Sequence, residues 1–163
     1  MKRLFIFLFA IAVAHTASAQ DPKPKFMYLK SDTGKIFLLP DSTLFSTAKL
    51  QKNKTTIMIY FGPDCGHCIT FTKRMVDSID LLSHTQIVMV SSFEMDKIRK
   101  FYQDLNLSQC ANIRVGKDRN FEFIGNYNVR NFPSAYIFDK TGKYVRSFSG
   151  DIDIKELAAK ANR

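Results

Sequence analysis

The sequence predicts an α/β fold in which a mixed β-sheet is covered by helices. Residues 55–61 form a run of β-forming and largely apolar residues, which is typical of a central strand buried on both faces. From residue 68 onward the apolar residues recur in steps of three and four, which indicates a helix directly after that strand. Near the C-terminus two strand-like segments flank a turn and a helical pattern follows, so these later strands are expected to be antiparallel.

The N-terminus has the plan of a secretory signal peptide. Two basic residues precede an apolar run over residues 4–14, and the tripeptide ending at Ala19 has the small-residue spacing that signal peptidase cleaves. The apolar run is too short to cross a bilayer as a helix. We therefore expect residues 1–19 to be a signal peptide, which places the cleaved protein in the periplasm or outside the cell without a stable membrane anchor. An uncleaved membrane anchor is the alternative.

A single domain is expected after the signal peptide. Residues 20–25 are polar and contain two prolines, and we interpret them as a short linker. Residues 26–163 are long enough to bury a core of their own. At the start of this domain, the apolar runs 26–29 and 36–39 flank Asp-Thr-Gly-Lys, a pattern that predicts an N-terminal β-hairpin.

The remaining elements are predicted from the same kinds of pattern. After the strand at 55–61 and its helix, we expect a strand at 85–90 and a helix that a capping box of Ser91 and Glu94 opens. A short strand at 113–115 and a short helix or loop at 121–127 follow. The chain then forms a hairpin of strands 134–138 and 143–148 around a turn at 139–142, and a last helix that Asp151 or Asp153 caps.

Two of the three cysteines form the tetrapeptide Cys65-Gly-His-Cys68 at the junction between the buried strand and its helix. Their spacing places both sulfurs on one side of the first helical turn, close enough to form a disulfide. Unpaired backbone N–H groups and the helix dipole favour a thiolate at Cys65, and His67 adds positive charge. We therefore expect Cys65 to attack a substrate disulfide and Cys68 to resolve the mixed disulfide. Cys110 is interpreted as a buried thiol, with a third redox thiol as the alternative.

Other roles for a Cys-x-x-C pair fit this sequence less well. A zinc site would need further ligands, and His15 and His84 do not provide the spacing. A c-type haem needs His directly after the second cysteine, where Ile69 stands. A purely structural disulfide would close too small a loop to stabilise the fold appreciably. We therefore expect no metal and no cofactor besides the Cys65–Cys68 disulfide.

The formal net charge of +9 does not indicate a nucleic-acid partner. The basic residues are scattered along the chain, and no motif that reads bases is present. We interpret them as a solvated basic surface, with weak attraction to anionic membranes or acidic partners as the alternative.

The order of these features resembles the thioredoxin superfamily over residues 26–163. The resemblance lies in a strand, the Cys-Gly-His-Cys tetrapeptide, a helix, and a distant Phe132-Pro133 before a later strand. The export signal, the N-terminal hairpin and the turn at residues 139–143 are most similar to the TlpA/ResA-like periplasmic thiol–disulfide oxidoreductases. The tetrapeptide itself is similar to the active-site motif of protein disulfide isomerases. The implied fold is a thioredoxin-like fold.

The resemblance also implies site residues. The Phe132–Pro133 bond is expected to be cis, with Pro133 against the dithiol and the backbone at Phe132 free to pair with a substrate strand. Asp64 and Gly66, which flank Cys65, are expected to contact the substrate as well.

Protein disulfides or dithiols are the implied substrates, and a membrane or periplasmic protein is the implied electron donor. The architecture favours a reductase. A disulfide oxidase or isomerase, or a binding or chaperone module with little redox turnover, are the alternatives.

Two residues depart from the pattern of the superfamily. Its members usually carry an aromatic residue directly before the first cysteine, where this chain has Asp64, and a carboxylate there would oppose formation of the Cys65 thiolate. Many members also carry a buried acid six residues before that cysteine, which accepts the proton of the resolving thiol. Here that residue is Ile59, so the route of the proton from Cys68 differs.

Overall fold

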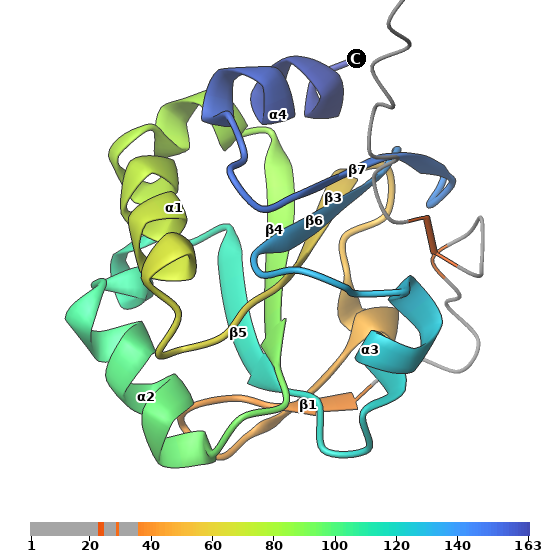
Figure 1. The fold of residues 1–163 in the computed structure, drawn as a ribbon. Coiled ribbons are helices and arrows are strands. Elements are labelled where there is room, and N and C mark those ends of the chain that lie inside the picture. The colour runs from red at the N-terminus through yellow and green to blue at the C-terminus, as the bar shows by residue number, and fades with distance from the viewer. Residues whose placement is uncertain (1–22, 25–28, 30–35) are drawn as a thin grey trace, which may run out of the picture.

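A seven-stranded mixed β-sheet organises the chain (Figure 1). The structure, a computed structural model, describes residues 23–24, 29 and 36–163. Along the sheet the strand order is β2-β1-β5-β4-β3-β6-β7. The strands are β1 (Ile36–Leu38), β2 (Leu44–Ser46), β3 (Thr55–Tyr60), β4 (Thr85–Ser91), β5 (Ile113–Lys117), β6 (Ser134–Phe138) and β7 (Tyr144–Ser149).

The three central strands β3, β4 and β5 run parallel, and the flanking strands are antiparallel to their neighbours. All six residues of β3 are buried, because a central strand of a sheet with helices on both faces meets no solvent. Parallel strands end at the same edge of a sheet, so the segments that follow β3, β4 and β5 gather at one edge.

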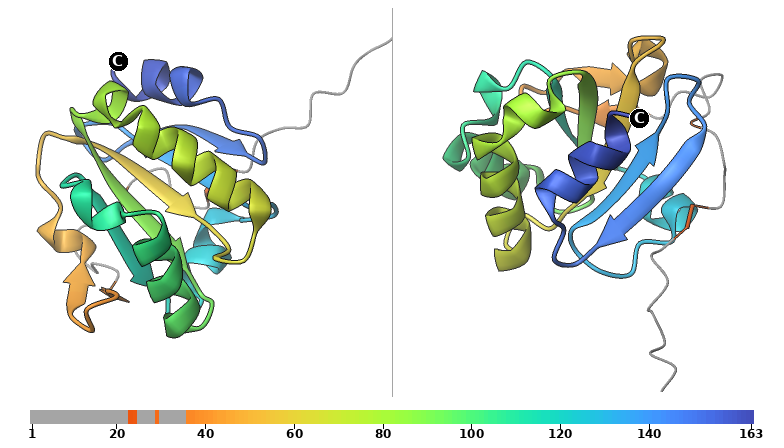
Figure 2. Two further views of the ribbon diagram at one scale, coloured as in Figure 1. Left: turned by 90° about the vertical axis from the view of Figure 1, so that its left-hand side faces the viewer. Right: turned by 90° about the horizontal axis from the view of Figure 1, so that it is seen from above.

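In the described part of the chain, four α-helices cover the two faces of the sheet unequally. They are α1 (Gly66–Asp77), α2 (Met95–Asp104), α3 (Glu122–Tyr127) and α4 (Ile154–Ala161). Figure 2 shows α1, α2 and α4 on one face and α3 on the other. Three 3-10 turns join the elements, η1 (Thr47–Lys49), η2 (Ile79–Leu82) and η3 (Leu107–Gln109). None of the helices in the described part of the chain has the length and apolar character needed to span a membrane.

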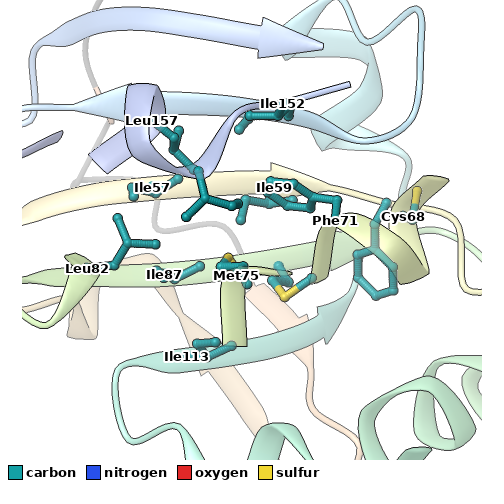
Figure 3. Packing of buried hydrophobic residues seen from close by; sticks show 14 of the residues in the cluster. Ile57, Ile59, Cys68, Phe71, Met75, Leu82, Ile87, Ile113, Ile152 and Leu157 are labelled. Carbon is teal, nitrogen blue, oxygen red and sulfur yellow. The ribbon is translucent and has the colours of Figure 1, made fainter. Parts of the chain in front are cut away.

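Successive residues of β3 contribute to two separate cores, since side chains of a strand alternate between faces. Ile57 and Ile59 face the three-helix side, where they pack with Phe71 of α1 and Leu157 of α4 (Figure 3). Met58 and Tyr60 belong to the core on the α3 side.

The core on the α3 side is largely a stack of aromatic rings. Tyr60 stacks on Phe123 with their ring centroids 5.5 Å apart, and Phe123 stacks on Tyr127 at 4.0 Å. Tyr136 meets Tyr127 edge to face at 5.1 Å. Aromatic pairs at such distances stabilise beyond their burial alone, so this column holds α3 firmly against β3 and β6.

The structure confirms the predicted fold class, including a hairpin at the N-terminal side of the domain. That hairpin joins Ile36–Leu38 to Leu44–Ser46. Of the arm expected at 26–29 only Leu29 is described; it lies outside any strand, and its N–H donates to the carbonyl of Gly142 at 2.7 Å. Most of the linker and the signal peptide lie outside the described residues. β1 also pairs with β5 at Leu38 and Lys117.

The helix starts bear out one capping prediction and contradict another. Asp153 caps α4, where its Oδ1 accepts hydrogen bonds from the backbone N–H groups of Lys155 and Glu156 at 2.7 and 3.0 Å. The prediction of a capping box at Ser91 and Glu94 was wrong, because Ser91 still belongs to β4 and the side chain of Glu94 makes no capping hydrogen bond.

Candidate functional site

The Cys-Gly-His-Cys tetrapeptide lies where β3 gives way to α1. Beyond β3, the N–H of Phe61 still donates to the carbonyl of Val90, and a tight turn then brings the N–H of Cys65 to 3.2 Å from the carbonyl of Gly62. Cys65 is the N-cap residue of α1, and its Sγ accepts a hydrogen bond from the N–H of Cys68 at 3.4 Å. A partly exposed sulfur thus lies on the helix N-terminus, where free N–H groups stabilise negative charge.

Cys68 occupies a different environment three residues later. It is fully buried, and its Sγ accepts a hydrogen bond of 3.4 Å from the N–H of Gly62. Burial, followed by the hydrogen bond with Cys65, raises the pKa of the Cys68 thiol to about 12. Ile59 and Phe71 belong to the same apolar cluster (Figure 3). The two thiols therefore lie in different surroundings, and the buried thiol of Cys68 is held protonated.

A second loop from far along the chain meets this sulfur. The Phe132–Pro133 bond is cis, as the resemblance implies, and the carbonyl oxygen of Phe132 lies 4.0 Å from the Sγ of Cys65. Pro133 is buried, and its own carbonyl accepts a hydrogen bond from the N–H of Gly150. The two segments converge because β6, which begins at Ser134, pairs directly with β3.

The aromatic ring of Phe132 closes one side of the site. It packs against Tyr60 with ring centroids 5.4 Å apart and meets the edge of Phe93 at 6.4 Å. A Cβ atom on Gly62 would lie 3.3 Å from Cys65 Cβ and 3.4 Å from the Phe132 ring, so a residue without a side chain suits this crowded turn.

Sequence reasoning did not identify Gly62 or Phe93 as site residues. A glycine at the end of a buried strand signals a close backbone approach, but it does not identify the Phe132 ring as the partner. Phe93 lies two residues after the end of β4 and is 37% exposed in the structure; nothing in the sequence marked it as a site residue.

The three other predicted site residues lie beside or between the cysteines, and all three are exposed. Gly66 and His67 are exposed in the first turn of α1. Asp64 is turned toward α2, where its Oδ2 accepts a hydrogen bond from the Nζ of Lys97 at 2.6 Å.

A hollow of about 400 Å³ separates α1 from α2 beside this ion pair. Its apolar lining comes from Pro63, Ile69, Phe101 and Leu105, and charged side chains from both helices line the rest, among them Asp64 and Lys97.

Cys110 lies outside this arrangement. It follows η3, packs in the core on the three-helix side, and is buried, which raises the pKa of its thiol. All three cysteines are free thiols. Within the described ranges, no group of His, Cys, Asp and Glu side chains could hold a metal ion.

Comparisons with known proteins agree on the kind of domain. The family model for a thioredoxin-like domain matches residues 43–163. An SCO2-like protein of Rickettsia typhi is 25% identical over 153 residues, and the match covers 76% of this chain and 73% of that protein.

Two solved structures from Mycobacterium tuberculosis share the fold. One is a secreted disulfide oxidoreductase homologous to Escherichia coli DsbE, with a TM-score of 0.66 and 15% identity over 78% of this chain and 93% of that one. The other is DsbF in mixed oxidised and reduced forms, with a TM-score of 0.69 and 14% identity over 82% of this chain and 97% of that one.

Proposed function

The chain belongs to the thioredoxin-like domain family, and from that premise we propose that it is a thiol–disulfide oxidoreductase with Cys65 and Cys68 as its redox dithiol. One observation carries the proposal. The Sγ of Cys65 lies on the N-terminus of α1, 3.4 Å from the N–H of Cys68, and the backbone of Phe132 approaches it from the other side. A partly exposed sulfur that is stabilised as a thiolate and lies beside an accessible backbone segment is suited to disulfide exchange.

The exchange takes place in two steps. The Cys65 thiolate attacks one sulfur of a substrate disulfide, so that a mixed disulfide forms and the other substrate sulfur leaves as a thiolate. Cys68 then gives up its proton and attacks the Sγ of Cys65. The Cys65–Cys68 disulfide forms, the second substrate thiolate leaves, and two electrons have passed to the substrate.

The residues around the sulfur have separate roles in this proposal. The carbonyl of Phe132 receives the backbone of an extended substrate segment, and Pro133, which has no N–H, holds that loop against the dithiol. Gly66 leaves room above the sulfur, and Asp64 contacts the substrate at its edge. His67 adds positive charge near the thiolate when it is protonated.

We propose reduction of disulfides in exported proteins as the net direction. A dithiol protein in the periplasm or membrane would then have to reduce the Cys65–Cys68 disulfide after each turnover. An oxidase or isomerase would carry the same residues with a higher reduction potential, and a binding or chaperone module would not cycle. The reduction potential of the pair, measured in glutathione or dithiothreitol buffers, separates the three: strongly negative for a reductase, high for an oxidase, and no cycling for a binding module.

Three single variants test the proposed roles of the cysteines. Cys65→Ser should abolish insulin disulfide reduction, and Cys68→Ser should accumulate mixed disulfides that are visible on non-reducing gels. Cys110→Ala is the matched control and should leave turnover nearly unchanged. If both the Cys65 and the Cys68 variants are inactive and neither accumulates a mixed disulfide, the assignment of Cys65 as attacking thiol and Cys68 as resolving thiol is contradicted. A large loss of turnover in Cys110→Ala would point to a third redox thiol.

A further inference from the structure

The ion pair between Asp64 and Lys97 links the cysteine loop to the first turn of α2. The Nζ of Lys97 lies 2.6 Å from the Oδ2 of Asp64, and the two side chains are 48% and 61% exposed. The hydrogen bond to Asp64, and then the negative charge of that residue, raise the pKa of Lys97. Asp64 directly precedes Cys65, so along the chain the pair lies one residue from the cysteine that is proposed to attack.

Lys97 is the third residue of α2, where the positive end of the helix dipole disfavours a cation. The negative charges of Asp96 and Glu94 at the start of the helix offset part of this effect. One turn later, Lys100 forms a comparable pair with Asp104 at 2.8 Å, entirely within the helix. The contact that sets Lys97 apart is therefore its bond to the loop that carries Cys65.

We propose that Lys97 is the counter-ion of Asp64, and that this pair keeps the aspartate from suppressing the nucleophilicity of Cys65. The inference rests on the proposed role of Cys65 as the attacking thiol. An unpaired carboxylate beside a thiol disfavours the thiolate, whereas a carboxylate bound to an ammonium group contributes little net potential. Lys97 touches no reacting atom and acts through Asp64, so it is a positioning residue.

The rate at which iodoacetamide alkylates Cys65 measures the nucleophilic reactivity of its sulfur, and peptide mass spectrometry identifies the modified site. At pH 7 and low salt, Lys97→Met should slow the reaction about threefold, and Asp64→Asn should accelerate it about threefold, because exposed ion pairs are weak. The double variant carries no charge at either position and should return to within about 1.5-fold of wild type. Lys97→Arg should retain the wild-type rate, and in 1 M NaCl the differences should shrink.

Lys100→Met is the matched control, since it removes an equivalent lysine from the same helix without touching the cysteine loop. Its alkylation rate should equal that of wild type. Opposite shifts in the two single variants of the pair, with recovery in the double variant, are not expected from a purely structural role. A wild-type rate in Lys97→Met, or shifts of the same sign in both single variants, would overturn the proposal.

Exchange of the wild-type protein with glutathione keeps this outcome separate from the proposed function. If the wild type does not form the Cys65–Cys68 disulfide in glutathione buffers, the proposed oxidoreductase function is contradicted, and the proposed role of the ion pair, which depends on it, is contradicted as well. If the wild type cycles but its alkylation rate does not differ from that of Lys97→Met, only the counter-ion role fails.

Discussion

The resolving step should be limited by the proton on Cys68, and replacement of Ile59 tests this directly. With a pKa of about 12 for this thiol, on the order of one molecule in 10⁵ carries the Cys68 thiolate at pH 7. The hydrogen bond with Cys65 changes once that sulfur is in a mixed disulfide, but the burial that contributes most to the shift remains. Decay of a preformed mixed disulfide should therefore accelerate about tenfold per pH unit from pH 6 to 9.

Ile59→Glu would place a carboxylate in the apolar cluster that contains Cys68. Burial raises the pKa of an introduced acid toward that of the thiol, which makes it an effective acceptor of the Cys68 proton. We expect resolution at pH 7 to be at least about tenfold faster than in wild type, with a weaker dependence on pH. Stopped-flow fluorescence or quenched gel samples of the mixed disulfide would measure the decay.

This substitution also destabilises the fold. Ile59 is fully buried between Met89 of β4 and Ala135 of β6, and loss of its packing together with burial of a polar group costs about 3–5 kcal/mol. Because the raised pKa favours the protonated folded state, this variant should lose further stability as the pH rises. Ile59→Gln has a similar cost but offers no base, so it is the matched control and should resolve no faster than wild type. Rapid, pH-independent resolution in wild type, with no gain in Ile59→Glu, would refute the reasoning and make Asp64 the next candidate acceptor.

Two further predictions concern the two ends of the chain. Asp153→Ala removes the cap of α4 and should lower the urea midpoint of unfolding by about 0.5 M, whereas Asp151→Ala, which loses only an exposed pair with Arg74, should change it less. Backbone hydrogen bonds lower the pKa of Asp153, so the effect should be present at neutral pH and fade as the pH falls through that pKa; an equal effect at pH 2 would contradict the capping role. The protein exported by its native host should begin at Gln20, and an intact mass that includes Met1 would contradict cleavage.

Much of the fold could be predicted from the sequence because its strongest patterns are local. The buried run that became β3 and the apolar steps of α1 each lie in one short window, and so does the aspartate that caps α4. The capping box at Ser91 failed because pairing of β4 with β5 continues to Ser91 and Lys117, and a sheet hydrogen bond outweighed a local capping motif. The partner of Asp64 could not be predicted for a related reason. Lys97 is one of many scattered lysines, and only the packing of α2 beside the cysteine loop brings it within reach.

Phe132 makes two separate contacts, one through its backbone carbonyl and one through its ring. Its carbonyl faces the sulfur of Cys65, while its ring continues the column of Tyr60, Phe123 and Tyr127 on the opposite side of the sheet. These contacts restrain the position of the loop on both sides. Under the proposed function, we therefore expect disulfides in frayed or unfolded segments to reach this edge more readily than disulfides held in rigid domains.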